Sequence, residues 1–353
     1  MIEPNRRQQE ILRLFLMRGE DTLSSSHIHA ELLKIGEDMS LVSVKRELPR
    51  MTAAGLLRAS GNGRSRAYGI NIAGRMASAV DAGAYCAMEP DTRYGLDHFN
   101  FDLFPAWPSQ IFSASEEDAL ERATDEYRRR ITDLPPAIAR KELERLIIEL
   151  SWKSSKIEGN TYTLLDTEKL ILEQKEAPGH DKKEAVMILN HKDAFQFIHG
   201  HPQQFTTLTR ANLEQVHRLL VKDMSVGFGF RQKAVGVIGS KYRPLDNIYQ
   251  IAEAVDALAK AVSRGHTPYA KALTVLLGIG YIQPFEDGNK RAARMMANAL
   301  LLAHRAAPLS YRSADEKEYR EAMLVFYELL SVVPFRRIFT EQYLFAAKNY
   351  AVR

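Results

Sequence analysis

One short segment of the sequence, Gln283–Arg294, contains residue types that together could bind a phosphate. The apolar run before it is typical of a buried helix that ends near Ile282, and Pro284 and Gly288 then favour a turn. A second helix is expected to begin at Asn289. The backbone N–H groups at a helix start have no partner within the helix, and the helix dipole makes that end positive. We therefore expect an anion-binding site in front of this turn.

Three cationic side chains and the carboxylate of Asp287 could act at the turn. Arg291 and Arg294 are three residues apart, so they share one face of the expected helix, and Lys290 lies in the same turn. Arginine matches a phosphate with two parallel hydrogen bonds, and a bound anion would balance cations that the positive end of a helix disfavours. Asp287 can supply a hard oxygen to a Mg²⁺ ion that is shared with phosphates. The spacing predicts a site for a magnesium-bound phosphate compound.

The same segment resembles the signature of the Fic family, H-x-F-x-[D/E]-G-N-G-R-x-x-R. Six of its eight fixed positions match, and a chance match of this extent is expected far less than once in ~10⁴ chains of this length. From about residue 114 to 350 the chain is predicted to be almost wholly helical, which suits the all-α fold of that family. The matching residues are Phe285, Asp287, Gly288, Asn289, Arg291 and Arg294.

The resemblance implies that this protein transfers AMP from ATP, bound with Mg²⁺, to a hydroxyl side chain of a target protein. It assigns Asp287 to Mg²⁺ and Arg294 to the γ-phosphate, and it implies that Phe285 anchors the loop in the core. A short hairpin at Ala234–Arg243 would be the flap that aligns a target segment by strand addition; the alternative is a surface loop. The residues implied to line the phosphates are Gly288, Asn289, Lys290 and Arg291.

Two positions depart from the signature. Gln283 stands where the family has the histidine that accepts the proton of the target hydroxyl, and a neutral amide cannot accept a proton at physiological pH. Loss of general-base catalysis typically lowers a rate by ~10²–10⁴-fold, so we expect nucleotide binding to survive better than transfer. Lys290 replaces the second glycine, as in the Doc branch that transfers phosphate, so the identity of the transferred group stays open. The histidines interpreted as ordinary surface or core residues are His191, His217, His266 and His304.

A second motif, Ser154–Asn160, resembles the inhibitory motif of the family, [S/T]-x-x-x-E-[G/N]. Glu158 is expected at the end of one helix, where an anion is disfavoured, and Arg294 near the start of another, where a cation is disfavoured. The resemblance implies that these two side chains pair and block productive placement of the γ-phosphate. It also implies that Ser154 is hydrogen-bonded within the same inhibitory contact. It also implies self-inhibition within one chain. Gly159 and Asn160 complete the motif, although Gly159 is equally typical of an ordinary helix C-cap.

Residues 1–80 are predicted to form a winged helix-turn-helix domain. Apolar residues at helical spacing predict the first helix, serines can cap the second and third, and a glycine-containing turn favours a hairpin after them. In such a domain the third helix enters the major groove of DNA and the wing contacts phosphates. The expected segments are the helices Asn5–Arg18, Ser24–Leu33 and Ser40–Gly55 and the hairpin Leu56–Ile70.

Cations in this segment are the candidate DNA contacts. Pro49 lies inside the third helix and is expected to kink it, because proline removes a backbone donor. The alternative function of such a domain is protein contact or dimerisation. The candidate DNA-binding residues are Lys45, Arg46, Arg50, Arg64 and Arg66.

The rest of the chain divides into a connector, 81–113, and a Fic-like domain, 114–353, with an inhibitory helix near 137–160. The connector is rich in proline and aromatic residues, which favours packing against a neighbour over a free linker. Periodic apolar residues predict ten helices in the second part. They are 116–132, 137–157, 166–175, 182–198, 209–222, 249–263, 268–281, 289–304, 315–330 and 338–350.

Composition favours a globular protein, with 353 residues, 45% hydrophobic and 26% charged. The net charge of +4 comes from the first 80 residues, which hold 12 Lys/Arg and 8 Asp/Glu, as in a nucleic-acid-binding module joined to a neutral domain. The longest apolar run, Ala272–Ile282, is too short to span a membrane, and the chain start lacks the apolar stretch of a signal peptide. The single cysteine, Cys86, excludes an internal disulfide framework. We expect a cytoplasmic location and no membrane partner.

Three hypotheses remain at this level. The first is a self-inhibited protein adenylyltransferase that is slow or conditional because of Gln283. The second is a DNA-binding transcriptional regulator whose Fic-like domain serves as a nucleotide sensor or interaction module. The third is an inactive partner in a hetero-oligomer. The sequence leaves open the target protein, the DNA site and whether the chain forms a homodimer.

Overall fold

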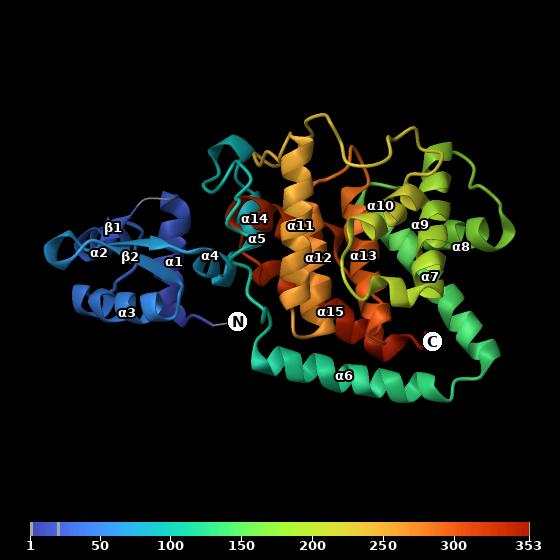
Figure 1. The fold of residues 1–353 in the computed structure, drawn as a ribbon, viewed down its shortest axis with the longest axis horizontal. Coiled ribbons are helices and arrows are strands. Elements are labelled where there is room, and N and C mark those ends of the chain that lie inside the picture. The colour runs from blue at the N-terminus through green and yellow to red at the C-terminus, as the bar shows by residue number, and fades with distance from the viewer. Residues whose placement is uncertain (1–2, 20–21, 353) are drawn as a thin grey trace. The chain divides into compact units, whose positions relative to one another are not determined.

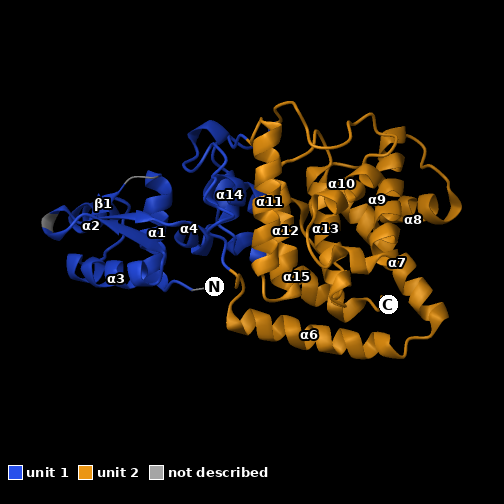
Figure 2. Ribbon diagram, in the orientation of Figure 1, with its two compact units in different colours: residues 1–108, 236–243, 321–336 blue, residues 109–235, 244–320, 337–353 orange. Residues whose placement is uncertain are grey.

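The computed structural model describes residues 3–19 and 22–352, without the side chain of Arg64. It is mainly helical (Figure 1). The chain divides into two compact units (Figure 2). The N-terminal unit comprises residues 1–108, 236–243 and 321–336, and the helical unit comprises residues 109–235, 244–320 and 337–353.

The N-terminal unit begins with three helices and a small antiparallel sheet of strand order β1-β3-β2. In the sheet, Leu57 pairs with Ile70 and Leu23 pairs with Tyr68. Apolar residues from all three helices form the core beneath it. The elements are α1 (Arg6–Arg18), β1 (Leu23–Ser24), α2 (Ser25–Lys34), α3 (Leu41–Ala53), β2 (Leu57–Ser60) and β3 (Ala67–Ile70).

The predicted helix starts are confirmed by their caps. Asn5 forms a capping box with Gln8, Ser24 accepts a hydrogen bond from His27 N, and Ser40 accepts one from Ser43 N. Each cap satisfies a backbone donor that lacks a partner within its helix. Helix α3 continues through Pro49 to Ala53.

Two short helices, α4 (Ile72–Ala77) and α5 (Ala82–Cys86), lead into the connector. Three of its aromatic residues, Phe99, Phe104 and Trp107, are buried as expected, whereas Phe101 is exposed. The Trp107 ring packs edge-on against Phe326, with ring centroids 6.0 Å apart, and Phe104 lies beside Trp107. Segments far apart in sequence therefore share one core.

The helical unit is built around α12 and α13, which lie side by side at its centre with α11 (Figure 1). All residues of α12 except Pro268 and Lys271 are buried. The ten helices predicted between residues 114 and 353 are present with shifted ends, and parts of α14 and α15 belong to the N-terminal unit. They are α6 (Ala114–Thr132), α7 (Pro136–Ile157), α8 (Leu164–Glu173), α9 (Lys182–Gly200), α10 (Arg210–Leu220), α11 (Ile248–Arg264), α12 (Pro268–Ile282), α13 (Asn289–Ala303), α14 (Glu316–Leu329) and α15 (Val333–Asn349).

The hairpin predicted at Ala234–Arg243 is wrong. Within the described residues this segment contains no strand, and its one β contact is an isolated bridge between Arg243 and His98. Its backbone groups are bonded to the connector instead: Arg243 N donates to Asp97 O (2.8 Å), and Arg93 Nη1 donates to Gly239 O (2.9 Å). With these groups occupied, the two halves of the segment do not pair with each other.

No helix in the described part of the chain is long and apolar enough to cross a membrane.

Candidate phosphate-binding loop

The loop between α12 and α13 is held by two residues in the left-handed region. Gln283, at φ 51° and ψ 59°, ends α12 and donates its N–H to Ile279 O. Gly288, at φ 80°, precedes α13, and a Cβ there would lie 3.2 Å from Val221 Cγ1 and 3.3 Å from Arg291 Nη2. The positive φ therefore favours glycine, and a Cβ would press against both side chains. The first bond within α13 is Ala292 N to Gly288 O, so the N–H groups before it lie at the positive end of the helix.

Asn289 closes the loop around Phe285. Its Oδ1 accepts a hydrogen bond from Phe285 N, and its Nδ2 donates one to Phe285 O, both at 2.8 Å. The side chain is buried and uses its acceptor and one donor in this way. Asn289 therefore shapes the loop, and its backbone N–H lies at the helix start, where an anion would bind.

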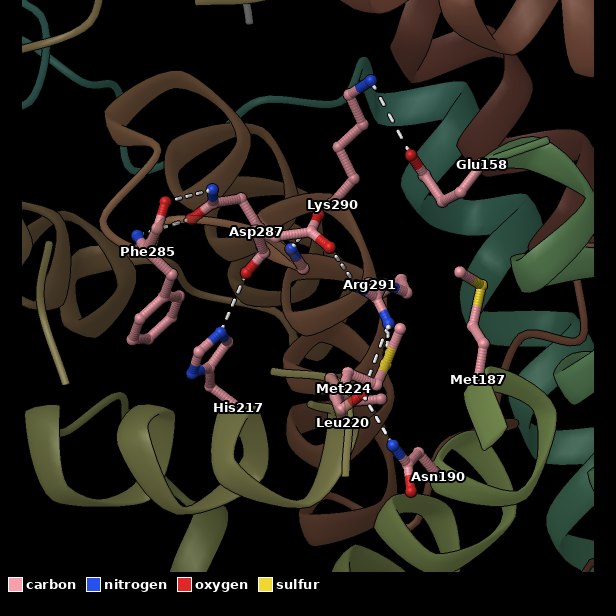
Figure 3. A network of polar contacts seen from close by, with 12 residues as sticks. Glu158, Met187, Asn190, His217, Leu220, Met224, Phe285, Asp287, Lys290 and Arg291 are labelled. Carbon is pink, nitrogen blue, oxygen red and sulfur yellow. Dashed lines mark hydrogen bonds and ion pairs between the residues drawn. The ribbon is translucent and has the colours of Figure 1, made fainter. Parts of the chain in front are cut away.

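Phe285 is buried, as expected for an anchor, and it stacks on His217. The two rings lie 3.6 Å apart between centroids with an angle of 4° between their planes. His217 Nε2 donates to Asp287 O at 2.9 Å (Figure 3). Burial lowers the pKa of His217 to about 4, and Arg291 contributes in the same direction, so the ring is neutral at physiological pH. Sequence reasoning missed this support because no motif includes His217.

The Gln283 side chain turns back onto its own helix. Its Nε2 donates to Gly280 O at 2.6 Å, and the side chain is buried. Its backbone carbonyl accepts a hydrogen bond from Arg231 Nε at 2.7 Å. The position of the signature histidine therefore carries an amide engaged with backbone.

Arg231 is a second residue that sequence reasoning missed. It is buried, its N–H donates to Pro284 O (2.9 Å), and Nη1 donates to Lys233 O (2.8 Å). Nη2 donates to Leu245 O. The guanidinium thus caps the end of α12 and links it to the backbone at Lys233 and Leu245. Nothing in its local sequence signals this role.

Arg291 is buried and anchors α13 to the end of α10. Its Nη2 lies 2.9 Å from Asp287 Oδ2, and its Nη1 donates to Leu220 O at 3.3 Å and approaches Met224 Sδ at 3.4 Å (Figure 3). Burial lowers the pKa of Arg291, although Asp287 and Glu158 act in the opposite direction. This side chain therefore links the loop to the end of α10.

Asp287 combines an exposed carboxylate with local bonds. Its side chain is 62% exposed, Oδ2 pairs with Arg291, and Oδ1 accepts from Gly288 N at 2.6 Å. Among the described residues no group of three or more His, Cys, Asp or Glu side chains could hold a metal. A Mg²⁺ ion bound by Asp287 would need phosphate oxygens and water to complete its ligands, which is a usual set for this ion.

Arg294 is fully buried and is bonded to the end of α7. Its Nη2 lies 2.8 Å from Glu158 Oε1 and donates to Ser154 O at 2.9 Å, while Nε donates to Ser154 Oγ at 2.8 Å. Lys290 Nζ lies 3.8 Å from the other oxygen of Glu158 (Figure 3). The two motifs singled out in the sequence therefore meet in space.

The charges of this contact stabilise one another. Burial alone would raise the pKa of Glu158, but Arg294 and Lys290 hold it below its usual value. Burial would lower the pKa of Arg294, but Glu158 raises it. Gly159 and Asn160 act locally: Gly159 turns the chain at φ 97°, and Asn160 Nδ2 donates to Glu184 O at 3.0 Å.

The candidate DNA-binding residues lie in α3 and after β2. Lys45, Arg46, Arg50 and Arg66 are exposed. Arg46 Nε and Arg50 Nη1 lie 3.5 and 3.2 Å from Glu47 Oε1, so one buried carboxylate serves both. The side chain of Arg64 lies outside the described residues.

Part of the chain matches a known protein family. Residues 207–301 match the model of the Fic/DOC family. The protein adenylyltransferase Fic of Nematostella vectensis is 25% identical over 203 residues, which cover 56% of this chain and 48% of that protein. The chain spans about half the length of this curated relative.

Solved structures share the fold. Fic-1 (residues 134–508) from C. elegans superposes with a TM-score of 0.58 at 17% identity, over 67% of this chain and 72% of that one. A Fic family protein from Desulfovibrio desulfuricans G20 has a TM-score of 0.55 at 20% identity, over 68% of this chain and 75% of that one. A Fic domain containing signalling protein from Bacteroides thetaiotaomicron has a TM-score of 0.55 at 18% identity, over 65% of this chain and 94% of that one.

Proposed function

Since residues 207–301 form a Fic/DOC family domain, we propose that this protein binds ATP with Mg²⁺ at the Gln283–Arg294 loop as a self-inhibited relative of protein adenylyltransferases. The observation that supports this most is the contact of the buried Arg294 with Glu158 at 2.8 Å. An arginine at the start of a helix beside a glycine turn is suited to a phosphate, and here a carboxylate occupies it.

In the proposed reaction, the hydroxyl oxygen of a target side chain forms a bond to the α-phosphorus of ATP. The bond from that phosphorus to the oxygen bridging the α and β phosphates breaks, and pyrophosphate leaves. Gln283 can orient the hydroxyl but cannot take its proton, so the proton passes to water and transfer is slow. Mg²⁺ would offset the charge of the phosphates when bound.

This chain's residues then have distinct tasks. The backbone N–H groups at Asn289, Lys290 and Arg291 would hold the phosphates, and Asp287 would be the protein ligand of Mg²⁺. Arg294 would hold the γ-phosphate after release from Glu158. Because Arg291 is already bonded to Asp287 and α10, its main effect would be to brace the loop and to add positive charge.

The test compares three proteins: wild type, Glu158→Gly, and Glu158→Gly combined with Gln283→His. Each is incubated with ATP labelled at the α or the γ phosphate and with cell extract as a source of targets. We expect no label in wild type, weak α-label incorporation in Glu158→Gly, and ~10²–10⁴-fold more when the histidine is restored. Label from the γ position instead would assign phosphate transfer.

Calorimetry of ATP binding provides the second readout. We expect Glu158→Gly to bind ATP with Mg²⁺ more tightly than wild type. Absence of both binding and label in all three proteins would contradict the proposed function. Binding without label in the first two would indicate a nucleotide sensor or an inactive partner.

A second candidate function is DNA binding by the N-terminal unit. It is favoured by the order of three helices and a hairpin, with exposed Lys45, Arg46 and Arg66 on the third helix and beside the hairpin. The test is a mobility shift with upstream promoter DNA at 50 and 200 mM salt, using wild type and a variant with Lys45, Arg46 and Arg64 changed to Gln. We expect salt-dependent binding that the variant loses. Equal shifts by both proteins would contradict it.

A further inference from the structure

The Arg294–Glu158 contact continues into a buried chain of hydrogen bonds that reaches α9. Ser154 Oγ, which accepts from Arg294 Nε at 2.8 Å, also lies 2.8 Å from His191 Nε2. On its other side His191 Nδ1 lies 2.8 Å from Met187 O. Ser154, His191 and Arg294 are all buried at 1% exposure or less.

The directions of these bonds follow from their two ends. Met187 O can only accept, so His191 Nδ1 carries a proton and donates it, and Nε2 then has a lone pair. Ser154 must therefore donate its hydroxyl proton to Nε2. Its oxygen is left with lone pairs, one of which accepts from Arg294, a group that can only donate.

A charged imidazole would disrupt this arrangement. With a proton on Nε2, His191 and Arg294 would both donate to Ser154 Oγ. The hydroxyl proton of Ser154 would then have no acceptor among these hydrogen-bonded groups. Burial lowers the pKa of His191 to about 3, and Arg291 and Arg294 contribute in the same direction, so the ring is neutral. The ring is thus a fixed acceptor.

We propose that His191 is a positioning residue that holds Ser154 as an acceptor for Arg294 and thereby strengthens the self-inhibited state. The inference rests on the proposed function, because it assigns to α9 a part in keeping Arg294 from phosphate. No family motif named above contains His191. The residue acts through Ser154 and touches no reacting atom.

The experiment measures the dissociation constant of ATP with Mg²⁺ by calorimetry in full-length variants. His191→Leu removes the acceptor and keeps an apolar core, whereas His191→Gln can accept from Ser154 and donate to Met187 O. We expect His191→Leu to bind ~5- to 10-fold more tightly than wild type, because loss of one such bond raises the fraction of free Arg294 by that factor. We expect His191→Gln within ~2-fold of wild type.

A matched control and a double variant separate positioning from general loosening. Ser155 Oγ lies 3.4 Å from the other nitrogen of the same ring and makes no contact with Arg294, so Ser155→Ala is expected to leave the affinity unchanged. The double variant Ser154→Ala with His191→Leu is expected to have the same dissociation constant as Ser154→Ala alone, since both changes break the same series of hydrogen bonds. Additive effects would overturn the proposal.

A nucleotide-free readout keeps the inference distinct from the proposed function. The Arg294 Nε–H resonance, assigned by its loss in Arg294→Lys, is expected to be protected from solvent exchange in wild type and in His191→Gln. It is expected to lose protection in His191→Leu. Unchanged protection in His191→Leu would overturn the positioning role. If protection falls but Glu158→Gly binds no ATP, the proposed function fails and the inhibitory part of the inference falls with it.

Discussion

Asn289 bonds both the N–H and the carbonyl of Phe285, and the cost of losing it can be predicted. In Asn289→Ala these two buried backbone groups lose their partners, so we expect the free energy of unfolding to fall by about 2–4 kcal/mol. Urea denaturation followed by circular dichroism measures this. The neighbouring Lys290→Ala removes a half-exposed side chain and is expected to change stability by less than about 0.5 kcal/mol. Equal effects of the two changes would contradict the role given to Asn289.

Sequence predicted which residues form the loop better than it predicted what each does. The signature implies that Asn289 lines the phosphates, and the structure adds a role for its side-chain amide, which holds Phe285. The supports that the sequence missed, His217 and Arg231, come from other elements and bond backbone atoms. A backbone acceptor carries no side-chain identity, so a local pattern cannot indicate which distant residue will reach it.

At the scale of elements, the end of α12 depends on Arg231. In Arg231→Leu the carbonyls of Gln283, Lys233 and Leu245 lose a buried cationic donor. We expect hydrogen exchange of the loop peptide 278–290 to rise at least tenfold and stability to fall by about 2–4 kcal/mol.

Lys233→Ala is the control, since this exposed side chain lies two residues away. We expect it to leave exchange of the same peptide unchanged. Should Arg231→Leu also leave the exchange unchanged, the bonds of Arg231 would not be what orders the loop.

Helices were predictable because their signals are local. The caps Ser24 and Ser40 and the apolar periodicity lie within each segment, and the structure has the helices there. The start of α15 differs from the prediction for a local reason too. The helix begins at Val333 and not at 338, because a proline such as Pro334 is tolerated in the first turn of a helix. The hairpin at 234–243 failed because its partner, the connector around Asp97, is far away in the sequence.

At the scale of the whole molecule, buried charges join distant segments. In the N-terminal unit Glu328 is fully buried and accepts from Tyr85 Oη (2.6 Å), Ser240 Oγ (2.6 Å) and Arg93 Nη1 (3.3 Å). These donors come from the connector and from the 236–243 segment. The composition along the sequence does not predict that residues 321–336 belong to the N-terminal unit.

The stability of the helical unit is predicted to depend on pH through two buried histidines. Burial lowers the pKa of His191 to about 3 and of His217 to about 4, from an ordinary value of 6.5. Below pH 6.5 the unfolded chain takes up protons that the folded chain does not. The stabilisation is therefore complete above pH 6.5 and is lost as the pH falls toward 4 and 3.

Between pH 6 and 5 the loss is expected to be about 2 kcal/mol, since each histidine approaches 1.4 kcal/mol per pH unit. Glu158 contributes little in this window, because its pKa in the folded protein lies below the ordinary 4.5 and an unfolded glutamate is still mostly ionised at pH 5. Urea denaturation at pH 7.5, 6 and 5 measures the slope. His191→Gln with His217→Gln should reduce the slope, although His304, whose pKa burial also lowers, adds to it, whereas His266→Gln, at an exposed position, should leave it unchanged. A slope that the double change does not reduce would mean that the rings bracing Ser154 and Phe285 do not set the response to acid.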